Sequence, residues 1–415
     1  MRTVQDHLSM VLKAVRPVEP LEVSLSDAAG CILAQDIEVI ADVPALPLAS
    51  IDGYAVLSED IRDASTLSPK RLSVVADLTP VDRSPIHIEP GQCALVASGS
   101  LMPFEADTVV PFVYTDRGLN SVSIPTPLNS GSGVKPAGWD IAAGQAALTA
   151  GMRLNARRLA LAAGLGMSSL PVFPAPRVVI MPIGDELIVP GGRGAGVFDA
   201  NGPGLKSAIQ DLAAVAIQVA PGSDHPRELM RAIEDQMFWA DLVITTGGLS
   251  MSDHDTLQLV VSSLGTVAFD QVAMQPGRMH GVGVLHPGTR NMENYDNPVP
   301  VICLPGNPVA AVVGFELFVR PALRSMAGYS DIFRPSVLAD VKTTWVSPKG
   351  IRQFVPAFLS RNPQGRFEVE AIGDPLHLGQ PALSWLAGAN ALAVVPEEQT
   401  QVAPGGQVHC LVLED

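Results

Sequence analysis

The sequence predicts a multidomain protein of the α/β plus β class, and three features support this prediction. Apolar runs at 177–183, 241–246 and 299–304 each break at a turn rich in glycine and polar residues, and helical stretches separate them. From 37 to 135 the chain alternates short apolar runs with Pro, Gly, Asp and Ser, which is typical of an all-β domain. Over 331–415 short strands return without a long helix, which fits a small C-terminal β-barrel.

Helices are predicted on both sides of the first β-rich part. An amphipathic helix is expected over 3–15, a second short helix over 26–34, and a third over 156–163. The strands expected between them are the apolar runs 72–76, 93–97, 108–113 and 121–124.

The central part alternates strands with helices. Helical stretches over 204–219 and 256–264 separate the three apolar strands, and the stretch 309–326 follows the last one. Such alternation implies a parallel sheet, whose loops gather at the carboxyl ends of the strands. The three polar loops are therefore expected to face one pocket.

The loop after the second strand has the chemistry of a phosphate and cation site. Gly247 and Gly248 let backbone amides approach an anion, Thr246 and Ser250 add hydroxyl donors, and Asp255 offers the hard oxygen that Mg²⁺ takes. One such turn could equally be a plain strand-to-helix connection. Here the pattern recurs, with Gly184, Asp185 and Glu186 after the first strand and Pro305, Gly306 and Asn307 after the third.

Composition excludes several functional classes. No apolar run approaches the roughly 18 residues that span a bilayer, and residues 1–10 lack a signal-peptide core, so we expect a cytoplasmic protein without a membrane partner. The four cysteines are too scattered for a metal or disulfide framework. A formal charge of −15, a pI near 4.9 and no basic stripe argue against a nucleic-acid partner.

Ordered motifs along the whole chain resemble one family. GDEL at 184–187, DxN at 199–201, TTGGLSM at 245–251 and LPGNP at 304–308 resemble the MoeA-type molybdopterin molybdenumtransferases, whose eukaryotic relatives include the gephyrin E domain. The segments that extend the resemblance upstream and downstream are 52–55 (family MDGYA), 98–100 (TGA), 138–140 (GED) and 350–354 (GRxEF).

The resemblance implies four domains. They are an elongated helical and linker domain (1–36 and 137–172), an inserted β-domain (37–136), a MogA-like three-layer α/β domain with a mostly parallel sheet (173–327) and a C-terminal β-barrel (328–415).

The resemblance also implies a reaction. Members insert molybdate into adenylylated molybdopterin with Mg²⁺-dependent release of AMP, which is the final step of molybdenum cofactor biosynthesis. They act as homodimers with a shared cleft, which Asp52 enters from the partner subunit. Transient contacts with a MogA-type adenylyltransferase or with molybdoenzyme chaperones are expected. An acidic chain that handles such anions needs Mg²⁺ or a local concentration of positive charge, and Arg278, Arg352, Lys135 and Arg193 are the candidates.

The site residues follow from the matched motifs. Asp185, Glu186 and Asp255 are expected to bind Mg²⁺ directly or through water, and Asp52 and Asp140 are further catalytic candidates. Ser250, Arg278 and Arg352 are expected to position molybdate. The remaining substrate-binding candidates are Ser98, Gly184, Asp199, Asn201, Thr246, Gly247, Gly248, Gln275, Pro305, Gly306 and Asn307.

Three positions depart from the family pattern. Gln275 stands where the family has the first lysine of KPGK, Trp139 replaces the glutamate of GED, and Ser98 replaces the threonine of TGA. These departures keep open a catalytically divergent paralogue that acts as a molybdopterin-binding or scaffold protein. A MogA-like molybdopterin adenylyltransferase is the other alternative, and the flanking domains argue against it because such proteins resemble only 175–325.

Overall fold

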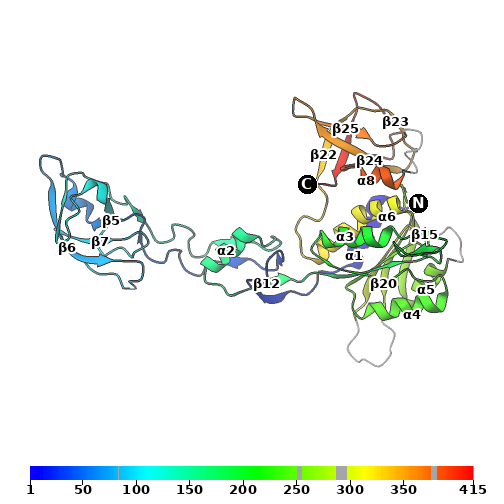
Figure 1. Cartoon of the computed structure of the whole chain (residues 1–415), viewed down its shortest axis with the longest axis horizontal. Helices are drawn as coiled ribbons and strands as arrows, with labels where there is room; N and C mark the ends of the chain where they lie inside the picture. Colours follow the sequence, from blue (N-terminus) through cyan, green and yellow to red (C-terminus); the bar gives the residue numbers. More distant parts are fainter. Residues whose placement is uncertain (83, 250–254, 287–296, 375–380, 415) are drawn as a thin grey trace. The chain divides into compact units, whose positions relative to one another are not determined.

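A computed structural model describes two compact units of the chain (Figure 1), each considered by itself. The described residues are 1–82, 84–249, 255–286, 297–374 and 381–414. The larger unit comprises 1–34, 151–155 and 169–415, and the smaller comprises 35–150 and 156–168. The four predicted domains are a finer division, and their boundaries stay a prediction. No helix in the described ranges is both long and apolar enough to cross a membrane.

The smaller unit is built on a five-stranded sheet. Its strands, in spatial order, are β8 (Thr108–Pro111), β5 (Gly53–Val56), β7 (Gln92–Val96), β6 (Lys70–Leu78) and β9 (Ser121–Ile124). The four strands predicted from short apolar runs are therefore confirmed, because alternate residues such as Leu72, Val110 and Val122 bury in one core. The predicted third helix is also present, as α2 (Ala156–Gly164).

Shorter pairings complete the smaller unit. β3 (Ile37–Glu38) pairs with β11 (Ala146–Leu148), and β4 (Leu48–Ala49) pairs with β10 (Val134–Lys135). Single turns of helix are η1 (Ser58–Ile61) and η2 (Phe112–Tyr114).

The larger unit begins with the predicted amphipathic helix. α1 (Val4–Ala14) starts at the N-cap Thr3, whose hydroxyl accepts from the Asp6 amide, and it buries Val4, Leu8 and Val11. The helix predicted over 26–34 is wrong. Gly30 has a φ of 81°, which ends any helix, and the chain continues as β2 (Ile32–Leu33). β2 pairs with β12 (Ser169–Phe173), as does β1 (Leu21–Ser24).

A six-stranded mixed sheet forms the centre of the larger unit. In spatial order the strands are β16 (Val215–Gln218), β13 (Arg177–Pro182), β17 (Leu242–Thr246), β21 (Val299–Leu304), β20 (Met279–Leu285) and β18 (Gly265–Gln271). The first four are parallel, as predicted, whereas β20 and β18 are antiparallel to their neighbours. The mostly parallel sheet is thus confirmed, with an antiparallel extension that was not anticipated.

Helices cover both faces of this sheet and complete the three-layer α/β arrangement. Val178 and Ile180 of β13 bury on the face that α1, α3 (Asn201–Gln210) and α6 (Pro308–Gly314) cover. Val179 and Met181 bury on the opposite face, against α4 (Pro226–Met237) and α5 (Thr256–Leu264) (Figure 1). The predicted helix 309–326 continues from α6 through a π-helical turn, η3 (Phe315–Val319), into α7 (Arg320–Met326).

The helix predicted over 204–219 is half wrong. It ends at Gln210 because Ala213 adopts a φ of 57°, after which Val215–Gln218 form β16 beside β13. The antiparallel β20 was also not predicted, because Gly281 and Gly283 weaken its strand pattern. A side chain at Gly283 would lie 2.0 Å from the Thr266 carbonyl oxygen on β18, so the close pairing requires glycine.

The C-terminal β-barrel is confirmed. Its strands are β22 (Ser336–Val341), β24 (Arg352–Arg361), β25 (Phe367–Ala371), β26 (Ala391–Val395) and β28 (Gln407–Val412). The barrel closes because β24 pairs with both β25 and β26. The short β19 (Met274–Gln275), which precedes β20 in the sequence, joins the edge of β24 in parallel register. The remaining short elements are β14 (Leu187–Ile188), β15 (Val197–Phe198), β23 (Trp345–Val346), β27 (Gln401–Val402) and α8 (Leu383–Ala387).

Candidate functional site

The three predicted polar loops lie together at one edge of the central sheet. β13, β17 and β21 are adjacent and parallel, so their carboxyl ends meet there. The Ile183 amide donates to the Thr246 carbonyl at 2.9 Å, and the Gly247 amide donates to the Leu304 carbonyl at 3.2 Å. The Asn201 side-chain amide donates to the Gly306 carbonyl at 2.9 Å. The loops are therefore tied to one another directly.

Backbone conformation and close neighbours favour glycine at these strand ends. Gly247 has a φ of 85°, and a side chain there would lie 2.4 Å from the Ile183 carbonyl oxygen. A side chain at Gly306 would lie 3.2 Å from the Gly247 Cα. A side chain at Gly184 would lie 2.6 Å from the Glu186 carboxylate oxygens. The edge therefore presents bare backbone beside carboxylates, which is the surface that an anion with its cation needs.

Buried polar atoms without a hydrogen-bond partner among the described residues lie at this edge. They include the Thr246 hydroxyl oxygen and the Asn201 side-chain oxygen. A buried polar atom without a partner costs about 1–3 kcal/mol. A bound polar ligand that contacts these atoms would remove that cost.

Asp255 and Asn307 begin the helices that follow two of the loops. Asp255 is 8% exposed, and its Oδ1 accepts from the Leu257 amide at 3.1 Å as the N-cap of α5. The Asn307 side-chain oxygen accepts from the Ala310 amide at 3.1 Å as the N-cap of α6. Aspartate and asparagine are strong N-caps, which explains why both helices start there.

Asp185 pairs with a residue that the sequence analysis missed. Asp185 and Asp224 each accept a hydrogen bond from the other's backbone amide, at 3.2 Å in both directions. Asp224 follows β16, the strand that was mistaken for part of a helix. Had that strand been recognised, a fourth loop at the same edge would have been predicted.

Asp199 serves the fold from a buried position. It is 3% exposed, and its two carboxylate oxygens accept from the Gly202 amide at 2.9 Å and from the Gln218 side chain at 3.2 Å. These bonds fix the start of α3 and so place Asn201 beside the loop at Gly306. A direct contact between Asp199 and substrate stays a prediction.

The carboxylates suit Mg²⁺ only with help from other ligands. Asp185 and Glu186 are exposed, and Asp255 is buried at the start of α5. Among the described residues no three His, Cys, Asp or Glu side chains converge closely enough to form a metal cluster. Mg²⁺ is usually held by one or two carboxylates together with waters and substrate phosphates, so this donor set fits a site that the substrate completes.

The basic candidates differ in how they are engaged. Arg278 is exposed and makes no ion pair in the part of the chain that the structure describes. Arg352 instead donates to Glu397 from Nε at 3.2 Å and from Nη2 at 3.0 Å, so a carboxylate already matches its charge. Lys135 and Arg193 are exposed. Ser250 lies outside the described residues, and its expected role with molybdate is unchanged as a prediction.

The smaller unit brings two of its candidates together. Asp52 is exposed, and its Oδ1 accepts from the Ser98 amide at 2.7 Å, while the Ser98 hydroxyl donates to the Ser50 carbonyl at 3.1 Å. Asp140 is exposed, and its amide donates to the Val43 carbonyl. Asp52 thus orders the turn at Ser98, and one of its oxygens has a role in the fold.

Comparisons with known proteins match this architecture from end to end. Residues 2–166 match the MoeA N-terminal region (domain I and II), 179–325 match a probable molybdopterin binding domain, and 339–413 match the MoeA C-terminal region (domain IV). The sheet edge with the three loops belongs to the second of these regions.

Full-length relatives agree. The chain is 33% identical over 419 residues to molybdopterin molybdenumtransferase 2 of Mycobacterium tuberculosis (strain ATCC 25618 / H37Rv), with 98% of each chain covered. It is 29% identical to the molybdopterin molybdenumtransferase of Nostoc sp. (strain PCC 7120 / SAG 25.82 / UTEX 2576), covering 100% of this chain and 94% of the relative. A crystal structure of a molybdopterin biosynthesis MoeA protein from Pyrococcus horikosii matches with a TM-score of 0.85 at 27% identity, covering 100% of this chain and 99% of that one.

The fold and the site thus define a multidomain protein with a molybdopterin-binding α/β domain and a C-terminal β-barrel. The chain belongs to the MoeA family of molybdopterin molybdenumtransferases.

Proposed function

We propose that this chain is a molybdopterin molybdenumtransferase that inserts molybdate into adenylylated molybdopterin and releases AMP, as the final step of molybdenum cofactor biosynthesis. The observation that supports this most directly is the set of three adjoining glycine loops within the molybdopterin-binding region. The MogA-like adenylyltransferase alternative is disfavoured, because MoeA-type regions flank that domain on both sides.

Different residues of the sheet edge would contact the phosphate oxygens and the Mg²⁺ at the phosphoanhydride. The bare backbone at Gly247, Gly248 and Gly306 would hold phosphate oxygens, and the buried Thr246 hydroxyl and Asn201 amide oxygen would complete the polar contacts. Asp185, Glu186 and Asp255 would hold Mg²⁺ together with those phosphates. Bound Mg²⁺ would supply charge neutralisation at the phosphoanhydride.

Molybdate is assigned to the loop between β19 and β20. Arg278 there is exposed and lacks an ion-pair partner among the described residues, so its guanidinium can meet a tetrahedral dianion with two hydrogen bonds. Gln275 adds a neutral donor where the family has lysine. Arg352 is the weaker candidate because Glu397 already engages it.

The remaining proposals concern the assembly. A homodimer with a shared cleft would bring Asp52, Ser98 and Asp140 of one subunit to the loops of its partner. Transient contacts with a MogA-type adenylyltransferase and with molybdoenzyme chaperones would supply substrate and remove product. We place the protein in the cytoplasm, without nucleic-acid or membrane partners.

The test is a direct assay of AMP release from adenylylated molybdopterin with molybdate and Mg²⁺, combined with rescue of molybdoenzyme activity in a cell that lacks its own molybdenumtransferase. We expect both activities. A folded dimer that binds molybdopterin but neither releases AMP nor rescues the cell would favour the divergent scaffold instead.

A further inference from the structure

A buried histidine lies directly behind the loop to which molybdate is assigned. His280, the second residue of β20, is fully buried, and its Nε2 lies 3.3 Å from the carbonyl oxygen of Gly277. A carbonyl oxygen only accepts hydrogen bonds, so Nε2 is the ring nitrogen that carries the hydrogen. The contact links a rigid strand of the central sheet to the residue just before Arg278.

Gly277 also packs closely against the loop that follows β21. It has a φ of 75°, and a side chain there would lie 2.7 Å from the Ala310 Cβ and 3.1 Å from the Pro305 Cγ. The 275–278 loop therefore packs against the proline-glycine loop that follows β21. Gly277, the residue before Arg278, therefore contacts both His280 and the start of α6.

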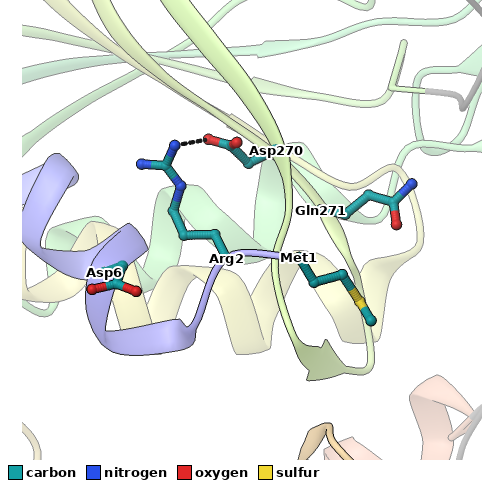
Figure 2. Close-up of a pocket in the computed structure, with 5 residues that line it drawn as sticks. All are labelled: Met1, Arg2, Asp6, Asp270 and Gln271. Atoms are coloured by element: carbon teal, nitrogen blue, oxygen red, sulfur yellow. Dashed lines mark ion pairs between the residues drawn. The ribbon is translucent and has the colours of Figure 1, made fainter.

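Backbone hydrogen bonds hold the segment that leads into the 275–278 loop. The Arg2 amide donates to the Gln271 carbonyl, and the Ala273 amide donates to the Arg2 carbonyl, both at 2.8 Å. Figure 2 shows the Arg2 guanidinium turned toward Asp270, with which it forms a 3.0 Å ion pair. From the barrel, the Arg352 amide donates to the Ala273 carbonyl at 2.9 Å. The Val272 amide also donates to the Arg278 carbonyl at 2.7 Å, so backbone hydrogen bonds hold the chain on both sides of Gly277, whose carbonyl is the group that His280 contacts.

The surroundings of the His280 ring keep it neutral. The ring packs against Phe318 and His7, with ring centroids 5.1 Å and 5.5 Å away, and Nδ1 has no hydrogen-bond partner within the described ranges. Burial lowers the pKa of His280 to about 3, so its single proton stays on Nε2 throughout the neutral pH range.

We propose that His280 is a positioning residue for molybdate: its Nε2–H, donated to the Gly277 carbonyl, fixes the 275–278 loop so that Arg278 faces the oxyanion. This inference rests on the proposed role of Arg278. It assigns His280 no contact with substrate, so its removal should change the affinity for molybdate and leave the binding of the pterin unchanged.

The first experiment measures the molybdate concentration for half-maximal AMP release. His280→Leu, which keeps an apolar side chain but removes the donor, should raise it about fivefold, as expected for one lost hydrogen bond, while the KM for adenylylated molybdopterin stays unchanged. His280→Gln places an amide donor at the same reach and should restore most of the wild-type value. His7→Phe is the matched control, because it alters the same ring cluster, its ring nitrogens have no hydrogen-bond partner among the described residues, and it should leave molybdate dependence unchanged.

A double-mutant cycle with Arg278→Ala separates the inference from its premise. If Arg278→Ala alone leaves molybdate dependence unchanged, the proposed role of the loop is wrong. If Arg278→Ala weakens molybdate binding, adding His280→Leu should have little further effect, because the group that His280 positions is already gone. A full additional fivefold loss in that background would overturn the positioning role, and so would equal defects in the Leu and Gln variants.

A measurement on the unmodified protein covers the case in which His280→Leu does not fold. Selective ¹⁵N-histidine labelling should show the His280 ring as a neutral Nε2–H tautomer between pH 6 and 8. A proton on Nδ1 instead would contradict the proposed hydrogen bond outright.

Discussion

In the proposed site, the parallel and antiparallel halves of the central sheet would bind anions by different means. At the ends of β13, β17 and β21, glycines leave the backbone bare, and the nearby charges are carboxylates. Next to β20 and β18 the loop 275–278 offers a side-chain cation, Arg278, and this loop is supported by a buried histidine, the N-terminal segment and the barrel.

Because of this difference, the two halves of the sheet are expected to contribute differently to the reaction. The proposed phosphate contacts of the parallel half come from backbone amides in glycine loops, so they depend on local sequence. A guanidinium on a loop is effective only when the loop is fixed, so the antiparallel half depends on residues that are distant in sequence. Mutations in the first half should abolish the chemistry, whereas mutations in the second should weaken oxyanion affinity.

The largest effect is expected for the buried carboxylate of the parallel half. Asp255→Asn keeps the N-cap oxygen of α5 but removes the charge, so Mg²⁺-dependent AMP release should fall about a hundredfold or more without loss of the fold. AMP release and thermal unfolding should be measured in parallel. Asp235→Asn, at an exposed aspartate of α4, is the control and should keep full activity. Unchanged AMP release in Asp255→Asn would remove Asp255 from the site.

The shared cleft predicts complementation between inactive chains. Asp52→Ala and Asp255→Asn should each be inactive alone, but a mixed dimer would contain one intact composite site. Random mixing should therefore recover about a quarter of wild-type AMP release. The assay is AMP release after joint refolding or coexpression of the two variants. If the mixture stays inactive although mixed dimers form, the site lies within one chain or Asp52 is only a turn residue.

Breaking the antiparallel half should give a smaller effect on affinity. Arg278→Ala removes a charged hydrogen-bond donor and should raise the half-saturating molybdate concentration about tenfold or more. Arg352→Ala should raise it about twofold at most, because Glu397 already engages the guanidinium. Titrating AMP release with molybdate ranks the two residues. A larger defect for Arg352→Ala than for Arg278→Ala would indicate that the oxyanion binds near Arg352, beside the barrel.

The sequence allowed the parallel half to be predicted better than the antiparallel half. The strands at 177–183 and 299–304 and their glycine loops were recognised because apolar runs and turn residues are local signals. β20 was not recognised, because Gly281 and Gly283 interrupt its strand pattern. A side chain at either position would clash with β18, so the reason for these glycines lies in the neighbouring strand. No local signal marks His280 as the partner of Gly277, because burial of its ring comes from α1 and η3, which are far away in the chain.

His7, which packs against His280 of β20, should make the free energy of unfolding depend on pH. Burial lowers the pKa of His7 to about 4, whereas it is 6.5 ordinarily, with Asp270 opposing and Arg2 adding to the shift. Between these values the unfolded chain binds more protons, so the free energy of unfolding should fall as pH decreases from 6.5 toward 4. Urea unfolding at pH 7 and pH 5 should show a loss about 2 kcal/mol larger for wild type than for His7→Phe. Equal losses would show that His7 does not contribute.

A gain in affinity is expected at the position where this chain departs from its family. Gln275→Lys adds a second cation to the loop of Arg278, and a charge-assisted contact with a dianion should lower the half-saturating molybdate concentration several-fold, or about 1 kcal/mol. The gain should shrink at high salt, because exposed charges are screened. Gln275→Met is the matched control, since it has similar length and no charge, and it should not improve affinity. The comparison is made by molybdate titration at low and high ionic strength. A gain that persists at high salt would indicate a change in loop structure instead of added charge, and no gain at all would mean that Gln275 lies too far from the oxyanion to matter.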